Sequence, residues 1–259
     1  MPTQAALPLF YDSIVPLSDP AHAGWKCPAI ERLPWLAGQN VVPLTIDEFS
    51  LAQCHYPIVF STDEAPVPLA LMGLEPGTNR FVDAAGAPVG QTYIPAYARR
   101  YPFVLARATP DAAHLSLCFD AASGLVGPEA EGQPLFVEGA PSEACLAILR
   151  FCESFDAAGE RTRAFIAEMQ RHDLLVEGEA RVTGGDAGEG HRFNGFRVID
   201  AERLKGLRGY VFRQWADRGY LPLVFAHLFS LERIGLLAVS VAPPAEAPTE
   251  LLLEEPVAG

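Results

Sequence analysis

The sequence predicts an α+β fold with a mixed or largely antiparallel sheet and with helices concentrated in the second half. Up to about residue 140, the chain has short apolar runs separated by Gly, Pro and Asp turns, a pattern typical of strands. Beyond that point apolar residues recur at helical spacing, as at Leu146, Leu149, Cys152 and Phe155. Strands and helices do not alternate regularly, which favours an α+β arrangement over a doubly wound parallel sheet.

The first 44 residues predict an extended arm packed on the rest of the protein. This segment is rich in proline and has no regular apolar period, but it carries Phe10, Trp25 and Trp35. Disordered arms are poor in such large apolar side chains, so we expect these three residues to anchor the arm. A short strand is predicted at 41–44.

The next part of the chain predicts one short helix followed by strands. Thr45 and Glu48 have the T-x-x-E spacing of a capping box, which satisfies free amide donors at a helix start. The helix should run to about Gln53 and end before the Tyr56-Pro57 pair, because a residue before proline avoids the helical region. Strands are then predicted at 58–61, 67–74, 103–107, 115–120 and 135–137.

The run at 115–120 predicts a half-buried strand, because its residues alternate between apolar and smaller or polar types. After it, Pro141-Ser142-Glu143 has proline and acid where a helix begins. Gly159 is expected to end this helix, and a second one should occupy about 160–172. Strands at 174–182 and 192–199, joined by a glycine-rich loop at 184–190, complete this part.

The last part of the chain predicts short helices and an ambiguous apolar run. Asp200 is a candidate N-cap for a helix through Leu204, and a helix at 209–218 should end at Gly219. The segment 220–231, YLPLVFAHLFSL, fits either a buried strand or a buried helix. We interpret it as a strand followed by a short helix at 232–239. Residues 1–242 would form one domain, and 243–259 an acidic, proline-rich tail without independent structure.

Charge and cysteine content exclude several classes of protein. The formal net charge of −13 disfavours a general nucleic-acid binder and docking on anionic lipid, both of which need a basic surface. Five cysteines, odd in number and without C-x-x-C spacing, indicate free thiols in a reducing compartment. No run approaches the roughly 18 apolar residues of a membrane-spanning helix, and no secretion signal is recognisable. We therefore expect a cytoplasmic protein without a membrane span, and no motif predicts a cofactor.

The segment 91–105, QTYIPAYARRYPFVL, contains the strongest candidate for a binding site. Arg99 and Arg100 could bind carboxylate or phosphate through two-point hydrogen bonds, with tyrosines stacking on the ligand. The tyrosines concerned are Tyr93, Tyr97 and Tyr101. The alternative is structural: the arginines would pair with some of the 32 acidic residues, and the tyrosines would pack a corner.

His55 and His227 are the next candidates, because each lies beside an apolar run. Histidine in such a place is a hydrogen-bonded core residue, a proton shuttle or a metal ligand. Neither belongs to a recognised metal-binding spacing, so no metal is predicted. Ser230 follows His227 by three residues and would share its face on a helix, but no serine lies in a nucleophile elbow. No catalytic residue set emerges.

Several stretches, taken together and in this order, resemble the bacterial SapC family. They are NVVPL at 40–44, EF at 48–49, HYPIVF at 55–60, YIPAYARRYPF at 93–103, LF at 135–136, NGF at 194–196, the region 204–207 and HLFSL at 227–231. The resemblance runs from about residue 17 to 237. Members are named for operons serving a bacterial surface layer, and similar proteins accompany loci for outer-membrane uptake and flavin-dependent halogenases. The resemblance carries over no catalytic residues.

These observations leave two main functional hypotheses. The first is a cytoplasmic accessory protein that binds a protein, a peptide or a small anionic ligand in a cell-envelope, surface-layer or nutrient-uptake system. The second is an enzyme or enzyme partner acting on an anionic small molecule or peptide. A deep pocket joining Arg99, Arg100 and a histidine would favour the enzyme, and a flat aromatic patch the binding protein. A structural surface-layer subunit is a third interpretation, which the lack of an export signal disfavours.

Overall fold

Two antiparallel sheets lie along one long helix in the computed structural model, which describes residues 7–109, 112, 114–182 and 191–238. This is the predicted α+β fold, and its long helix lies in the second half of the chain. The predicted glycine-rich loop at 184–190 and the acidic tail at 243–259 lie outside the described residues. No helix within the described part is both long and apolar enough to cross a membrane.

The larger sheet has five strands, and all its neighbouring strands are antiparallel. Their order is β11 (Leu175–Val182), β12 (His191–Ile199), β4 (Ile58–Phe60), β5 (Pro68–Leu71) and β3 (Val41–Pro43). The predicted strand at 41–44 is therefore an edge strand of this sheet. The central strands β4 and β5 are almost wholly buried, which agrees with their continuous apolar sequence.

The smaller sheet has three strands and includes part of the N-terminal arm. Its order is β1 (Ile14–Pro16), β7 (Ser116–Asp120) and β6 (Phe103–Ala106). Two short ribbons accompany it, β2 (Lys26–Cys27) with β8 (Gln133–Pro134) and β9 (Phe136–Val137) with β10 (Ala140–Pro141). The strand predicted at 115–120 is present as β7, but the expectation that only one of its faces is buried was wrong. Phe119 faces a core with Phe103, while Cys118 on the other side of the strand packs with Tyr11 of the arm.

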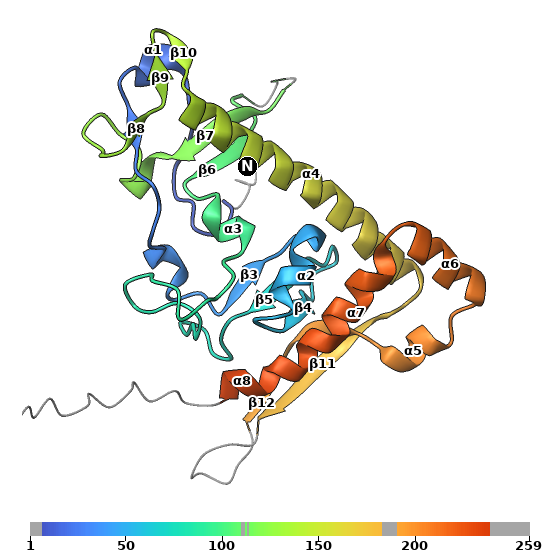
Figure 1. Ribbon diagram of the computed structural model, residues 1–259. Coiled ribbons are helices and arrows are strands. Elements are labelled where there is room, and N and C mark those ends of the chain that lie inside the picture. Colours follow the sequence, from blue (N-terminus) through green and yellow to red (C-terminus); the bar gives the residue numbers. More distant parts are fainter. Residues whose placement is uncertain (1–6, 110–111, 113, 183–190, 239–259) are drawn as a thin grey trace, which may run out of the picture.

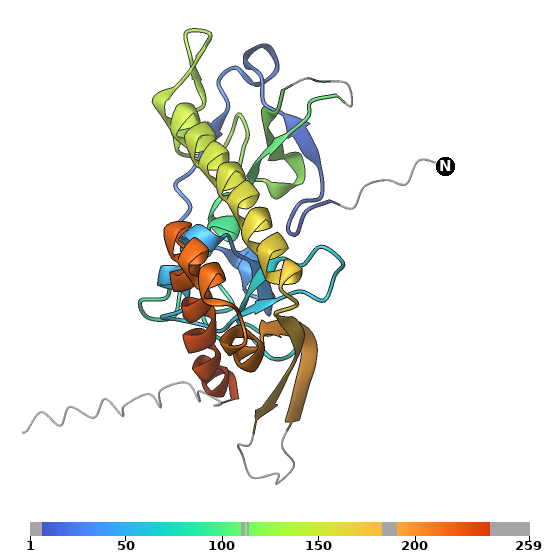
Figure 2. The same ribbon diagram turned by 90° about the vertical axis from the view of Figure 1, so that its right-hand side faces the viewer.

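The long helix α4 (Glu143–Arg171) connects the two sheets (Figures 1 and 2). Ser142 caps its start by accepting a hydrogen bond from the N–H of Cys145 at 3.1 Å. The expected break at Gly159 was wrong, because the helix continues through this residue. A glycine costs a helix only about 1 kcal/mol, and burial of Cys152 before it and Phe165 after it outweighs that cost.

The segment 220–231 is helical, so our interpretation of it as a strand was wrong. Gly219 has a positive φ of 72°, and it separates α6 (Gly209–Asp217) from α7 (Tyr220–Ser230). Helix α7 packs against β4 and β12 and buries Val224, His227 and Ser230. An apolar run this uniform has no clear period, so only tertiary packing decided between the two structures.

The remaining helices are short. They are α1 (Asp19–His22), η1 (Pro34–Leu36), η2 (Ile46–Glu48), α2 (Phe49–Ala52), α3 (Ala96–Arg99), η3 (Ala121–Ser123), α5 (Ala201–Lys205), η4 (Leu231–Arg233) and α8 (Ile234–Ala238). Asp200 caps α5 as predicted, by accepting hydrogen bonds from the N–H groups of Glu202 and Arg203. The main core lies between the larger sheet, α2, the second half of α4, α6 and α7. A second core lies between the smaller sheet and the first half of α4.

Candidate functional site

The segment with the two arginines is held in place by a buried carboxylate. Glu48 accepts hydrogen bonds at Oε2 from the N–H and hydroxyl of Thr45, at 2.8 and 2.9 Å. This confirms the predicted capping box. The other oxygen, Oε1, accepts from the Tyr93 hydroxyl at 3.0 Å and from the Ala96 N–H at 2.6 Å. One side chain therefore stabilises both η2 and the start of α3, the short helix that carries Arg99.

Arg99 lies on the surface and is held by neutral groups. Its Nε donates to the carbonyl of Ile94 at 2.9 Å, and its Nη2 donates to the Tyr93 hydroxyl at 3.2 Å. Its guanidinium carbon also lies over the rings of Tyr93 and Phe151, at 5.6 and 5.3 Å from their centroids. Burial, together with the nearby Glu48 carboxylate, raises the pKa of Tyr93 to about 12. Tyr93 is therefore protonated near neutral pH, and it donates to Glu48 while accepting from Arg99.

Arg100 lies in a corner of aromatic rings. Its guanidinium carbon is 4.4 Å from the ring centroids of both Tyr97 and Phe155, and 5.8 Å from that of Tyr11. The centroids of Tyr97 and Phe155 are 6.1 Å apart, so these rings form two walls of a corner rather than a sandwich. Cation–π contacts of this kind contribute roughly 1 to 2 kcal/mol when partly desolvated. The Nε of Arg100 is buried and has no hydrogen-bond partner.

Neither arginine is paired with an acidic side chain in the part of the chain that the structure describes. The structural alternative for this segment required such pairs. The tyrosines, in contrast, do pack the corner as that alternative expected: Tyr97 and Tyr101 are buried, and Tyr101 donates to the buried Asp120 at 3.0 Å. Asp120 also accepts from the N–H groups of Asp12 and Ser13, so Tyr101 helps to fix the N-terminal arm.

A pocket of about 370 Å³ opens beside the two arginines. Arg99, Arg100 and Tyr101 line it, and we call it the arginine pocket. Its other lining residues come from the arm, β6 and the first half of α4: Cys27, Pro28, Ile30, Phe103, Ala147, Ile148 and Phe151. Tyr93 and Tyr97 support the arginines without lining the pocket. The two adjacent arginines thus line one recess whose other side chains are mostly apolar.

The apolar walls of this pocket were missed by sequence reasoning. On α4, Ala147, Ile148 and Phe151 have the spacing of one helix face, but the sequence shows only that such a face packs against something. Ile30 comes from the aperiodic arm, whose path no local pattern predicts.

His55 does not line the arginine pocket. It follows α2, is half-buried, and has its ring 6.1 Å from that of Tyr56. Burial and, to a smaller extent, the charge of Arg233 lower its pKa. Nothing in these contacts assigns it a proton-transfer role.

His227 is fully buried and connects two strands. Its Nδ1–H donates to the carbonyl of Ile58 in β4 at 2.8 Å, and its Nε2 accepts from the N–H of Ile199 in β12 at 3.0 Å. The β12–β4 register pairs Arg197 with Phe60, and two residues further along it sets Ile199 opposite Ile58. The imidazole therefore replaces a direct hydrogen bond between the two strands. Burial lowers its pKa to about 4, so the ring is neutral.

Ser230 supports the same junction. Its hydroxyl accepts from the N–H of Ile58 at 2.9 Å and donates to the carbonyl of His227 at 2.6 Å. His227 and Ser230 do share one helix face, as their spacing indicated for a helix, but both serve to join α7 to the sheet. His227 does not reach the arginine pocket.

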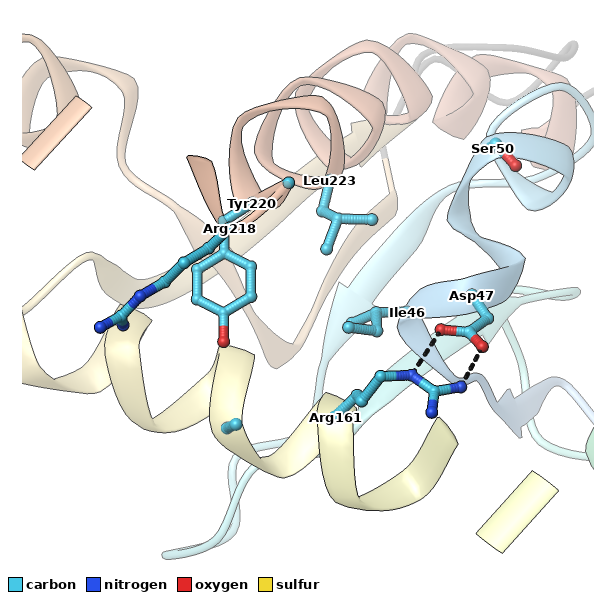
Figure 3. A pocket seen from close by; sticks show the side chains of 9 residues that line it. Ile46, Asp47, Ser50, Arg161, Arg218, Tyr220 and Leu223 are labelled. Carbon is cyan, nitrogen blue, oxygen red and sulfur yellow. Dashed lines mark hydrogen bonds and ion pairs between the residues drawn. The ribbon is translucent and has the colours of Figure 1, made fainter. Parts of the chain in front are cut away.

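A second pocket, of about 540 Å³, lies where α7 begins (Figure 3). Arg161 of α4 and Asp47 of η2 form an ion pair at one side, and the ring of Tyr220 points from the start of α7 toward α4. Arg218 also lines this pocket, with its Nη1 3.7 Å from the Glu168 carboxylate. Sequence reasoning missed this pocket, because its residues are far apart in the chain. Each of its arginines already faces a carboxylate, so it attracts anions less than the arginine pocket does.

No group of three or more His, Cys, Asp or Glu side chains within the described ranges is placed to hold a metal ion. The arginine pocket therefore remains the candidate site, because two arginines and several apolar side chains line it.

Comparison with known proteins places the chain in one family. The family model described as SapC matches residues 17–237, which is most of the chain. No curated protein and no solved structure matches it. The match includes every strand of the two sheets except β1, together with α4 and the two arginines. The chain belongs to the SapC family.

Proposed function

We propose that this protein is a cytoplasmic accessory protein of a bacterial cell-envelope, surface-layer or nutrient-uptake system, and that it binds an anionic group in the arginine pocket. The anionic group belongs to a small ligand, a peptide or a protein partner. One observation carries the proposal: two adjacent arginines line one pocket of about 370 Å³, and no carboxylate of the described residues pairs with either.

The charge balance of the chain makes this pair unusual. Asp and Glu residues number 32 and Lys and Arg residues 19, so acidic partners are abundant. A guanidinium that is partly buried and has no carboxylate partner loses favourable interactions with water. A bound anion compensates for part of this loss. Charge-assisted hydrogen bonds to an anion are the stronger kind, at roughly 1.5 to 3 kcal/mol each.

The lining of the pocket favours binding over catalysis. An enzyme acting here by proton transfer needs a general base within reach of the substrate. Among the described residues that line the pocket there is no histidine and no carboxylate. The titratable groups other than arginine are Cys27 and Tyr101, and burial raises the pKa of both, that of Cys27 to about 11. Both are protonated near neutral pH, so they supply no base.

The cytoplasmic part of the proposal is supported by the cysteines. All five are free thiols, including Cys118, Cys145 and Cys152 in buried positions. Free thiols persist in reducing compartments and are rare in secreted proteins.

The proposal predicts that an anionic apolar dye, 8-anilinonaphthalene-1-sulfonate, binds the pocket in an arginine-dependent way. In the double variant Arg99→Gln and Arg100→Gln, the Kd of the dye should rise at least tenfold, because both charge-assisted contacts are lost. Fluorescence titration at low salt measures this Kd. Arg99 is exposed, so Arg99→Gln alone should bind more weakly while keeping the wild-type melting temperature.

Arg163→Gln is the matched control, because Arg163 is an exposed arginine of α4 that pairs with Glu160 outside the pocket. Its dye affinity should equal that of the wild type. Arg100→Lys keeps the positive charge at this position. Comparing it with Arg100→Gln tests whether a loss of dye affinity in the latter comes from impaired folding or from the missing contact with the anion. Equal dye affinity in the folded double variant and the wild type would refute the proposed site.

A further inference from the structure

The walls of the arginine pocket restrict what the anion can be attached to. Away from the arginines, the lining side chains are carbon-rich, and the polar atoms among them are the thiol of Cys27 and the hydroxyl of Tyr101. The Tyr101 hydroxyl already donates to Asp120 at 3.0 Å, and the Cys27 thiol lies 3.5 Å from the carbonyl of Pro28. A sugar, a nucleoside or a polyol would leave unpaired those of its hydroxyl groups that face these walls, at about 1 to 3 kcal/mol each. The walls therefore fit an apolar body.

The number of available donors restricts the anion itself. Arg99 already uses Nε on Ile94 and one N–H of Nη2 on Tyr93. The Nε of Arg100 is enclosed, and its guanidinium already bonds to the Tyr97 side chain, so the remaining N–H groups of the terminal Nη atoms are what each arginine can offer. A planar carboxylate with two oxygens is matched by one or two such groups.

Phosphate sites usually add backbone N–H groups from the first turn of a helix or a glycine-rich loop. The described lining residues include none in such a place. Arg99 and Arg100 lie at the C-terminal end of α3, where backbone carbonyls are exposed, and the α4 residues lie beyond its first turn. The pocket is therefore better suited to a single negative charge than to a dianion.

We infer that the arginine pocket binds a small monocarboxylate with an aliphatic or phenyl body, a conclusion that rests on the proposed function. The carboxylate lies against the terminal nitrogens of Arg99 and Arg100, and the apolar body lies along Ile148 and Phe151 of α4. A volume of about 370 Å³ corresponds to roughly a dozen water molecules in liquid water. A carboxylate with about six to ten carbon atoms matches that space.

Competition against the bound dye tests the ligand class with three probes of equal chain length: octanoate, octyl phosphate and octan-1-ol. At pH 7.5 and constant ionic strength, octanoate should displace the dye at concentrations at least tenfold lower than either of the others. In Arg99→Gln, this advantage over octan-1-ol should shrink, because one cation is lost. Acetate should displace the dye at least a hundredfold less well than octanoate, because it buries no apolar body.

A wall variant separates the apolar contribution from the charge. Ile148→Ala removes side-chain atoms from a half-buried position, so the protein should stay folded. The Kd of octanoate should rise several-fold in this variant, and the Kd of acetate should not change. The assigned ligand class would be overturned if octyl phosphate displaced the dye as effectively as octanoate does. It would also be overturned if acetate were as effective as octanoate. In either case, dye binding that weakens when the arginines are replaced would still support the proposed function. Dye binding with the same Kd in the arginine variants and the wild type would refute the function itself.

Discussion

At the scale of single residues, His227 shows how a side chain can carry out a backbone function. The register of β4 and β12 sets Ile58 opposite Ile199, and the imidazole links these two residues through two hydrogen bonds, of 2.8 and 3.0 Å. The bridge works only while the ring is neutral, because Nε2 must accept from an N–H. A second proton would place two donors against each other in a fully buried site.

This arrangement predicts a loss of stability in mild acid. The pKa of His227 is about 4 in the folded protein and about 6.5 when unfolded, so the unfolded chain takes up the proton first. The free energy of unfolding should fall as the pH decreases from about 6.5 to about 4, by up to roughly 3 kcal/mol. Urea unfolding at several pH values measures this slope, and the stabilisation is complete above pH 6.5.

Two variants make the test specific to His227. His227→Gln should be less stable at pH 7 and should lack most of the slope between pH 4.5 and 6.5. His55→Gln should keep most of the slope, because His55 is only half-buried and burial therefore opposes its protonation less strongly. Glu168 has a lowered pKa, so its contribution to stability is lost only as the pH falls from the usual carboxylate range toward that lower pKa. A full slope in His227→Gln would contradict the assigned role.

Single residues also show how far the sequence could predict the site. Arg99, Arg100 and Tyr101 were predicted because their chemistry is visible in one short segment, and the structure does place them at one pocket. The ring of Phe155, which forms a wall around Arg100, comes from a distant helix and could not be inferred. For a related reason, the sequence left His227 open between a hydrogen-bonded core residue, a proton shuttle and a metal ligand. Its role depends on the register between two strands far away in the chain, which no local pattern reports.

At the scale of elements, α4 and α7 were the segments that local patterns described least well. The low helix propensity of glycine predicted a break at Gly159. The uniform apolar run at 220–231 had no period to distinguish strand from helix. In both segments, tertiary burial decided the structure. The helix starts that carry explicit capping residues, at Thr45, Ser142 and Asp200, were predicted correctly, because these signals act within four residues.

The continuity of α4 predicts that Gly159→Ala stabilises the protein. A Cβ at this position would have Arg163 Nη1 as its nearest neighbour, at 3.8 Å, which is an ordinary contact. Alanine also reduces the freedom of the unfolded chain, so the free energy of unfolding should rise by about 0.5 to 1 kcal/mol. Urea denaturation measures the change.

Gly178→Ala is the matched contrast. A Cβ on Gly178 of β11 would lie 2.3 Å from Cε2 of the buried Phe196, so that ring must move. Overpacking of this kind costs about 1 to 3 kcal/mol. The two Gly→Ala changes should therefore have opposite signs. A destabilising Gly159→Ala would mean that this turn of α4 is not a regular helix in solution.

At the scale of the whole molecule, α4 is the element that the two cores share. Its first half buries Cys145 and Cys152 in the core of the smaller sheet, and its second half buries Phe165 and Met169 in the main core. The arm adds a second connection, because β1 belongs to the smaller sheet while Leu36 lies in the main core. These connections support the proposal that residues 1–242 form one folding domain.

If the two cores form one cooperative unit, a change in the smaller one must destabilise the larger one equally. Phe119→Leu removes a buried ring from the core of the smaller sheet and should cost about 1 to 2 kcal/mol. Hydrogen exchange followed by mass spectrometry should then show the same loss of protection in peptides from β7 and from β12, because neither sheet unfolds without α4. The exposed Leu115→Ala, near β7, should change neither. Lower protection in β7 with unchanged protection in β12 would show two units that unfold separately, with the arginine pocket in the less stable one.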